Sequence, residues 1–308
     1  MLSYTIRRLL QAVIVIIGVT IVAFSVNFLA GDPTLVILGG DPRGMTREDI
    51  DAFRHEMGFD RPVIVQYLDW LGSAVKGDFG ISYRYKDSNS AIIRERLPAT
   101  LKLAGVSLLL SLIIALPLGV LAAIKKGTFW DRTSLVIALF GQSVPSFWLG
   151  LMLIMIVSVK LGWTPVSGQG GIEYMILPVI TLTSFSIARN MRMVRSSLLE
   201  VLGEDYIRTA KSKGLSKYVV LTRHALRNSL IPVVTLIGLD MGSLLGGTII
   251  VETIFAWPGM GWLTIQAITG KDLPLVQACV TFLALMFVLI NLIVDFTYSV
   301  LDPRVRLS

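Results

Sequence analysis

The residue types that most often carry catalytic chemistry are scarce in this sequence. Its 308 residues include a single cysteine, Cys279, and two histidines, His55 and His224, which lie far apart along the chain. One cysteine forms neither a disulfide bond within the chain nor a cysteine-based metal cage. We therefore expect no catalytic residue and no metal site.

Motifs for nucleotide binding and hydrolysis are also absent from the sequence. A phosphate-binding loop needs G-x-x-x-x-G-K followed by Ser or Thr, but the one Gly-Lys pair, Gly270-Lys271, precedes Asp272. His55-Glu56 does not continue as H-E-x-x-H, and neither G-x-S-x-G nor G-x-G-x-x-G occurs. We expect a protein that is not an enzyme and holds no cofactor. Active movement of a substrate would then take its energy from a partner or an ion gradient.

Three polar residues lie inside apolar stretches. Asp240 belongs to the stretch 229–251, and Asn291 and Asp295 belong to the stretch 276–301. Ionisable groups at membrane depth are costly and usually face a bundle interior or a water-filled path. Two interpretations stay open, namely a hydrogen bond between two spans and a place on a translocation path or proton relay.

A strip of glycines follows one helix face of the stretch 229–251. Gly238, Gly242 and Gly246 recur every four residues, and residues at this spacing share a face. Small residues allow two helix backbones to approach closely in a membrane. The strip is expected to pack either within this chain or against a second membrane subunit.

The composition places these residues in a membrane protein. Hydrophobic residues make up 54% of the sequence and charged residues 16%, and the mean hydropathy is +0.71. Soluble domains carry about 25% charged residues, and intrinsic disorder needs the opposite balance. We expect an all-α polytopic membrane protein. Its net charge of +7 must then be interpreted from its position along the chain, not as a signal for nucleic acid.

Six stretches are apolar enough to predict transmembrane helices, each of which needs about 20 such residues. The fourth stretch is short and contains several threonines and serines. The six stretches are residues 9–29, 103–124, 134–159, 174–188, 229–251 and 276–301.

The distribution of Lys and Arg predicts how these spans are oriented. Sixteen of them fall before the first span, in the second and fourth connections, and after the last span. The short third and fifth connections hold only Lys160 and Lys271. Because positive charges accumulate on the cytoplasmic side, both termini are expected in the cytoplasm and residues 31–99 outside it.

The long first connection carries signals for two helices. Thr46 suits an N-cap before an acidic first turn, and Gly58 would end that helix. Pro62 suits the first position of a second helix over residues 62–75. We expect a folded extracytoplasmic subdomain in this loop. The chain then divides into residues 1–30 with the first span, the subdomain 31–100, and a five-span core 101–308 that contains a cytoplasmic coupling loop, 189–228.

The fourth connection has a different chemistry, with nine Lys and Arg. Residues 204–213 favour a helix, Gly214 suits its C′ position, and Ser216 can N-cap a second helix over 217–227. A rigid, bent, basic element of this kind suits docking into a groove on a cytosolic partner. The same charges would also serve as a simple topology signal, and this alternative stays open.

Several stretches together resemble one protein family. The fourth connection contains Asp205-Tyr-Ile-Arg-Thr-Ala-Lys-Ser-Lys-Gly214-Leu and, further on, Arg223-His-Ala-Leu-Arg-Asn228. It resembles the EAA loop of binding-protein-dependent ABC importers, above all that of the dipeptide, oligopeptide and nickel permeases. The agreement extends to Gly58-Phe-Asp-Arg-Pro62, Gly77-Asp-Phe-Gly80, Arg96-Leu-Pro-Ala-Thr100, Gly246-Gly-Thr-Ile-Ile-Val-Glu-Thr-Ile-Phe255, Trp257-Pro-Gly-Met-Gly261 and Leu301-Asp-Pro-Arg304.

The resemblance implies a type I ABC importer permease fold in the cell inner membrane, within the lipid bilayer. It implies a homologous sister permease, two cytosolic ATPase subunits that bind ATP, and an extracytoplasmic substrate-binding protein, with no nucleic-acid partner. The implied function is peptide transport by alternating access. Nickel chelates and glutathione are alternative substrates. A gradient-driven carrier acting without ATPases would explain Asp240 and Asp295 but not the folded basic loop.

The resemblance also implies which residues couple the permease to its ATPases. In the general importer pattern, Glu-Ala-Ala stands three residues before a glycine, and here Arg208-Thr209-Ala210 precedes Gly214 at that spacing. Arg208 therefore stands where the family usually has a glutamate, and we expect it to make a different contact. The expected coupling residues are Arg208, Thr209, Ala210, Lys211, Gly214, Leu215, His224 and Leu226.

Overall fold

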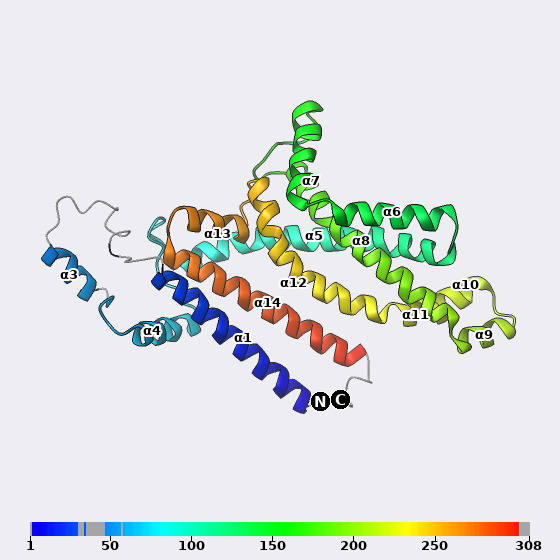
Figure 1. Cartoon of the computed structure of the whole chain (residues 1–308), viewed down its shortest axis with the longest axis horizontal. Helices are drawn as coiled ribbons and strands as arrows, with labels where there is room; N and C mark the ends of the chain where they lie inside the picture. Colours follow the sequence, from blue (N-terminus) through cyan, green and yellow to red (C-terminus); the bar gives the residue numbers. More distant parts are fainter. Residues whose placement is uncertain (1, 30–33, 35–46, 57, 302–308) are drawn as a thin grey trace. The chain divides into compact units, whose positions relative to one another are not determined.

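Helices form every regular element in the part of the chain that the structure, a computed structural model, describes (Figure 1). That part comprises residues 2–29, 34, 47–56 and 58–301. Within it the only β-type pairing is an isolated antiparallel bridge between Ile81 and Ser88. The expected all-α class is therefore confirmed. The chain divides into two compact units, Leu2–Pro98 with Gly259–Leu289, and Ala99–Pro258 with Ile290–Ser308.

The first unit combines the N-terminal third of the chain with a segment near its C-terminus. Phe79, Ile93, Leu263 and Leu275 are among the buried residues of its core. Its helices are α1 (Leu2–Leu29), α3 (Arg47–Glu56), α4 (Val63–Val75), the start of α5 (Asn89–Ile124), α13 (Met260–Thr269) and the start of α14 (Leu273–Leu301).

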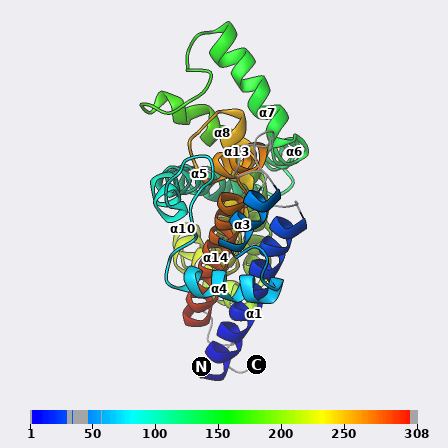
Figure 2. The same cartoon turned by 90° about the vertical axis from the view of Figure 1, so that its left-hand side faces the viewer.

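Helices α3 and α4 begin and end close to the places that the sequence predicts. Gly58 has a φ of +71°, which is left-handed backbone that ends α3 at low cost. Pro62 is the N-cap of α4 and lies one residue before the predicted position, so its missing N–H leaves no helical bond unmade. Helix α4 lies across α1 (Figure 2), where the Tyr67 ring lies 5.5 Å from Phe24 and its hydroxyl 3.0 Å from Thr20 Oγ1.

A buried aspartate joins the loop before α5 to the turn before α14. Asp272 is almost fully buried. Its carboxylate accepts hydrogen bonds from the Ser82 hydroxyl and from the backbone N–H groups of Tyr83 and Arg84, both at 3.1 Å. Burial also raises the pKa of the neighbouring Tyr83 hydroxyl to about 12. Because a buried carboxylate needs such donors, Asp272 fixes the conformation of residues 82–84.

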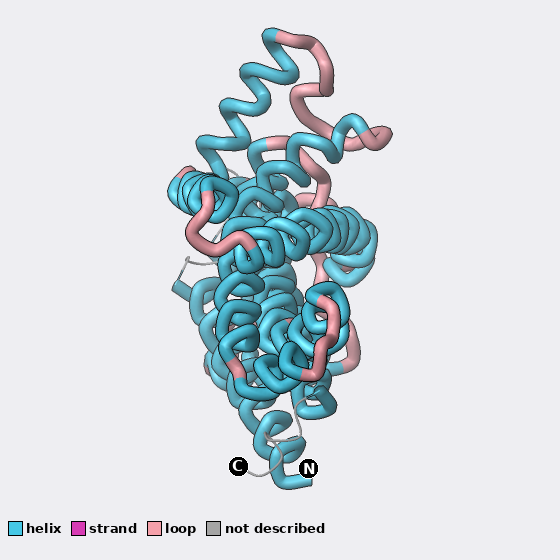
Figure 3. Tube along the Cα trace, turned by 90° about the vertical axis from the view of Figure 1, so that its right-hand side faces the viewer, coloured by secondary structure: helices cyan, strands magenta, loops and turns pink. Residues whose placement is uncertain are grey.

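In the second unit, long helices alternate with several short ones, and loops connect them (Figure 3). Helix α8 is central to it, because both α6 and α12 pack along α8. Its helices are the rest of α5, α6 (Phe129–Ser143), α7 (Ser146–Leu153), the π-helix η1 (Ile154–Lys160), α8 (Glu173–Gly203), α9 (Asp205–Ser212), α10 (Lys217–Val219), the π-helix η2 (Val220–Ala225), α11 (Leu226–Ser229), α12 (Ile231–Ile254) and the end of α14.

The predicted span over residues 134–159 does not form one straight helix, because the chain breaks at Pro145. Helix α6 ends at Ser143, α7 begins at Ser146, and their directions differ by 96°. A proline disfavours helical backbone in the residue before it, and Val144 is extended, with a ψ of 120°. Pro145 therefore acts as a helix boundary rather than as a kink inside one straight span.

Among the described residues, three helices are long and apolar enough to cross a membrane, or four if the bent pair counts as one span. The three are Thr5–Val26, Asn89–Ile124 and Leu273–Thr297, and the bent pair is Phe129–Ser143 with Ser146–Lys160. Two further predicted spans, 174–188 and 229–251, correspond to parts of α8 and to α12 with its preceding turn. The count of six and the side of each loop therefore stay predictions.

Candidate coupling segment and polar pairs of the helical core

The fourth connection forms the bent helix pair that its sequence predicts. Gly214 follows α9 with a φ of +78°. Its N–H donates to the Lys211 carbonyl at 3.0 Å and the N–H of Leu215 donates to the Ala210 carbonyl at 3.4 Å, which is a Schellman ending. Ser216 Oγ then accepts the Val219 N–H at 3.4 Å as the N-cap of the second helix. We call residues 205–229 the coupling segment.

The second helix of the coupling segment is longer and less regular than predicted. It was expected over residues 217–227, whereas helical backbone runs from Lys217 to Ser229. Its middle, Val220–Ala225, is π-helical. Short π-helical stretches are rare and often occur at functional sites. A hydrogen bond of 2.9 Å from Asn228 Nδ2 to the Tyr206 hydroxyl joins this helix to α9.

Apolar side chains anchor the coupling segment on its own unit. Ile207 and Ala210 of α9 and Val220 and Ala225 of η2 are buried in one cluster. The same cluster includes Leu198 of α8 and Ala123 of α5, and the half-buried Leu226 packs against it. The segment is therefore fixed to the cytoplasmic ends that the sequence predicts for these helices.

The predicted coupling residues consequently divide into two groups. Ala210 is buried, and Leu226 and His224 are half-buried. An exposed group is left to meet a partner: Arg208, Thr209, Lys211, Gly214 and Leu215. Arg208 Nη1 lies 3.3 Å from Asp205 Oδ1, but both side chains are largely exposed. An ion pair of this kind contributes little to stability, so Arg208 is available to another contact.

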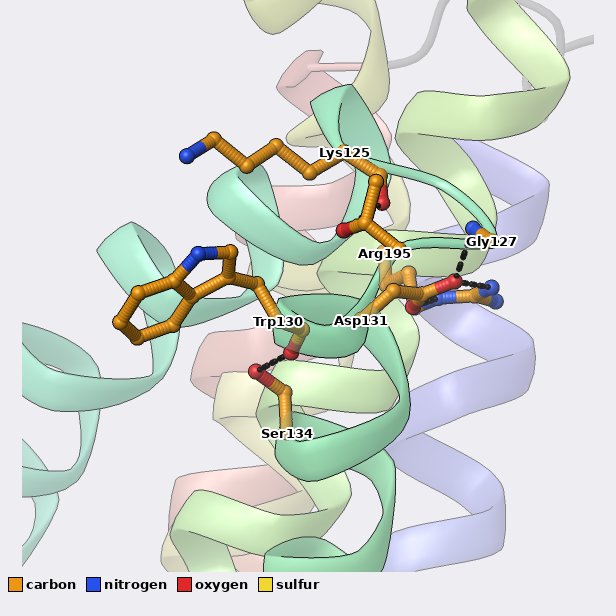
Figure 4. A network of polar contacts seen from close by, with 7 residues as sticks. Lys125, Gly127, Trp130, Asp131, Ser134 and Arg195 are labelled. Carbon is orange, nitrogen blue, oxygen red and sulfur yellow. Dashed lines mark hydrogen bonds and ion pairs between the residues drawn. The ribbon is translucent and has the colours of Figure 1, made fainter.

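A bidentate ion pair ties α6 to α8 just before the coupling segment. Arg195 Nε and Nη2 donate to the two carboxylate oxygens of Asp131 at 2.6 and 2.9 Å. The Gly127 N–H donates to the same carboxylate at 2.9 Å (Figure 4). Asp131 is buried, and charge-assisted pairs with this fork geometry are among the strongest hydrogen bonds. Sequence reasoning missed this pair, although Asp131 is the one acid in a basic connection.

A second ion pair joins α8 to α12. Arg189 Nη1 lies 2.8 Å from Asp240 Oδ1, and Asp240 is buried. From the sequence, Arg189 is one of the positive charges that indicate the cytoplasmic side, and nothing there pairs it with Asp240. Between these two positions along α8, Arg192 donates a hydrogen bond to the Gln142 side chain of α6. Three arginines spaced by three residues thus link α8 to α6 and α12.

The glycine strip and the remaining polar residues occupy different surroundings. A Cβ atom on Gly238 would lie 2.2 Å from Val294 of α14, so this glycine permits close packing within the chain. Gly242 is buried, whereas a Cβ on Gly246 would meet no atom within 4 Å. Asn291 and Asp295 lie half-buried on α14. The strip therefore has one end packed inside the chain and one end open.

The C-terminal end of α12 holds a buried carboxylate that sequence reasoning also missed. The Thr100 hydroxyl donates to Glu252 Oε1 at 2.7 Å, and Glu252 is fully buried. Nearby, Trp257 Nε1 donates to the Ala99 carbonyl at 3.0 Å. These bonds fix the end of α12 to the part of α5 in the same unit. In the sequence, the stretch that contains Glu252 carries only the family resemblance and gives no sign of this bond.

The histidines form no metal site within the described chain. No group of three or more metal-ligating side chains occurs there. His55 Nδ1 lies 2.6 Å from Asp60 Oδ2 on the surface, and this hydrogen bond holds the pKa of the Asp60 carboxyl below its usual value. His224 lies in η2 of the coupling segment.

Comparisons with known proteins show the class to which this fold belongs. The family model "Binding-protein-dependent transport system inner membrane component" matches residues 115–307, and the model of the N-terminal part of such components matches residues 1–104. The chain therefore belongs to the family of inner membrane components of binding-protein-dependent transport systems. The resemblance noted in the sequence is confirmed.

Individual relatives narrow this class. The chain is 40% identical to the dipeptide transport system permease protein DppB of Escherichia coli (strain K12), over 99% of both chains. It is also 40% identical to the oligopeptide transport system permease protein AppB of Bacillus subtilis (strain 168), over 99% of this chain and 100% of the relative. Among solved structures, the inward-facing MetNI methionine ABC transporter matches 68% of this chain and 96% of its own, with a TM-score of 0.59 and 20% identity. That last match shows the fold alone.

Family membership places the chain in the inner membrane as a multi-pass permease subunit of an ABC importer. It implies partner ATPase subunits and a substrate-binding protein. ATP hydrolysis is carried by the separate ATPase subunits of such importers. The absence of a phosphate-binding loop from this sequence agrees with that division of work.

Proposed function

We propose that this chain is one of two permease subunits of an ATP-driven importer of peptides. The observation that carries the proposal is the 40% identity, over essentially the whole chain, to permeases named for dipeptide and oligopeptide transport. These relatives do not favour nickel chelates or glutathione as the substrate, nor a gradient-driven carrier acting alone. The substrate class is therefore a short peptide.

The contacts within the second unit support a mechanism for coupling. The coupling segment is anchored on α8 by its buried apolar cluster. Helix α8 is joined to α6 by the Asp131–Arg195 pair and to α12 by the Arg189–Asp240 pair. Packed elements with such links move as rigid bodies. We infer that closure of the ATPases moves the coupling segment, and that α8 passes this movement to α6 and α12.

The exposed surfaces support a proposed assembly. Gly246 leaves an open place on α12 where the backbone of a sister permease can approach. The exposed coupling residues, from Arg208 to Leu215, would contact an ATPase subunit. Both termini would lie in the cytoplasm, and the helices α3 and α4 would lie outside and supply a docking surface for the binding protein.

Reconstitution tests the function directly. The chain would be co-expressed with a sister permease, two ATPase subunits and a binding protein, and the complex placed in proteoliposomes. We expect uptake of labelled dipeptides and oligopeptides that depends on ATP and on the binding protein. Uptake of glutathione or a nickel chelate in place of peptides would contradict the substrate class. Uptake that follows an ion gradient without ATP would contradict the mechanism.

A further inference from the structure

The turn between α5 and α6 carries exposed cations beside exposed aromatic rings. Lys125 and Lys126 follow the last residue of α5, Phe129 and Trp130 open α6, and Arg132 comes next. All five residues are exposed. Lys125 Nζ lies 5.6 Å from the centroid of the Trp130 ring. We call these five residues the α5–α6 turn surface.

This surface lies at the polar turn that connects the ends of two apolar helices, α5 and α6. Helix α5 contains a candidate membrane span and ends at Ile124. One face of α6 exposes Val136, Ile137 and Phe140, at the spacing that puts them on the same helix face as Phe129 and Trp130. An exposed apolar face that ends in aromatic rings and cations is typical of a helix that passes from the hydrocarbon core to the headgroups.

The one acidic residue of the turn is withdrawn from this surface. Asp131 is 3% exposed, and its carboxylate is occupied by Arg195 and by the Gly127 N–H. Figure 4 shows Asp131 and Arg195 meeting on one side of α6, while Lys125 and Trp130 extend from the other. The exposed face of residues 125–132 therefore carries three cations and no carboxylate.

We propose that the α5–α6 turn surface binds the headgroups of anionic phospholipids. The three cations attract the phosphate, and an anionic headgroup such as phosphatidylglycerol lacks the ammonium group that cancels the phosphate charge of a zwitterionic one. The rings of Phe129 and Trp130 lie at the level between headgroup and acyl chain. The ammonium of Lys125, held over the Trp130 ring, is kept at that same level. An acidic protein partner would also pair with the cations, but it would have to cover the apolar face of α6 as well.

The inference rests on the membrane location of the family and not on the substrate, so its test is separate from transport. The whole permease complex would be placed in nanodiscs that contain either brominated phosphatidylglycerol or brominated phosphatidylcholine. Bromine quenches tryptophan fluorescence on contact, and the share of Trp130 is the difference between the wild type and Trp130→Phe. We expect phosphatidylglycerol to quench that share several times more strongly, and the preference to weaken as salt is raised.

Charge variants decide whether the cations cause this preference. Lys125→Gln/Lys126→Gln/Arg132→Gln leaves the Asp131–Arg195 pair intact and should remove the preference almost entirely, while phosphatidylcholine still quenches Trp130. The matched control, Lys76→Gln/Lys86→Gln/Lys271→Gln, removes three exposed charges elsewhere and should keep the preference. The single variants Lys125→Gln and Arg132→Gln should each lose part of it, which keeps the test open if the triple variant does not assemble.

Two results would overturn the proposal. An unchanged preference in the triple variant would show that the cations do not select the lipid. Failure of both brominated lipids to quench Trp130 would show that protein, and not the bilayer, covers the surface.

Discussion

At the scale of single residues, burial decides what the Asp131–Arg195 pair contributes. Removing the arginine leaves a buried carboxylate without its cation, which costs about 3–5 kcal/mol. We expect Arg195→Gln to lower the midpoint of thermal unfolding of the purified complex more than Asp131→Asn does. The double variant should lower the midpoint by less than the two single variants together, because it leaves no buried charge without its partner. Arg223→Gln, at an exposed position, is the control, and an equal effect there would contradict the assignment.

Backbone conformation, and not crowding, makes Gly214 the residue of choice after α9. Its φ is +78°, yet a Cβ there would meet no atom within 4 Å. A β-branched residue would therefore cost about 1–2 kcal/mol of local strain without a clash. We expect Gly214→Val to reduce the ATPase activity that substrate stimulates, and Gly214→Asn, which tolerates left-handed backbone, to retain most of it. Equal activity in both variants would show that the left-handed turn is not needed for coupling.

At the scale of elements, α9 has one face for its own chain and one for a partner. Ala210 is buried against α8 and η2, whereas Thr209 beside it is exposed. Ala210→Glu places a charge in an apolar cluster and should release the coupling segment from α8. The complex should then lose its ATPase subunits and, with them, ATP-dependent uptake. Thr209→Glu adds the same charge outside and tests the partner contact alone. Intact assembly of the Ala210→Glu complex would contradict the anchoring role of this cluster.

Two glycines of α12 differ in what lies beside them. A side chain at Gly238 would collide with Val294 of α14, but a side chain at Gly246 would enter open space. We expect Gly238→Leu to prevent folding of the chain, measured as loss of a monodisperse species in detergent. Gly246→Leu should fold but fail to co-purify with the sister permease. Normal co-purification of Gly246→Leu would show that the open end of the strip is not the subunit contact.

Elements that depend on local chemistry could be predicted from the sequence, and those that depend on distant pairing could not. Gly214 and Ser216 predicted the bent pair because caps act over a few residues. Apolar length alone puts Pro145 inside a span, and it does not show that the chain changes direction at this proline. The Asp131–Arg195 pair joins residues 64 positions apart, and nothing in the sequence matches one acid to one arginine.

At the scale of the whole molecule, the positions of the charges predict an orientation that the helices themselves do not carry. The sixteen Lys and Arg assigned to the cytoplasm lie at both ends of the chain, at the turn from α5 into α6, along the second half of α8 and in the coupling segment. In that orientation α4 and the coupling segment are on opposite sides of the membrane. The same orientation is required for the coupling segment to meet a cytosolic ATPase.

Single cysteines test this orientation in the intact complex. Cys279 is the one cysteine of the sequence and is buried, and Cys279→Ser gives a background without a native thiol. Lys76, at the end of α4, and Lys213, at the end of α9, are both exposed and accept a cysteine without loss of a core contact. We expect a membrane-impermeant maleimide to label Lys76→Cys in whole cells, and Lys213→Cys only after the membrane is opened. Labelling of both from the same side would require an even number of membrane crossings between them, in place of the three that the sequence predicts. The coupling segment could not then lie where an ATPase partner needs it.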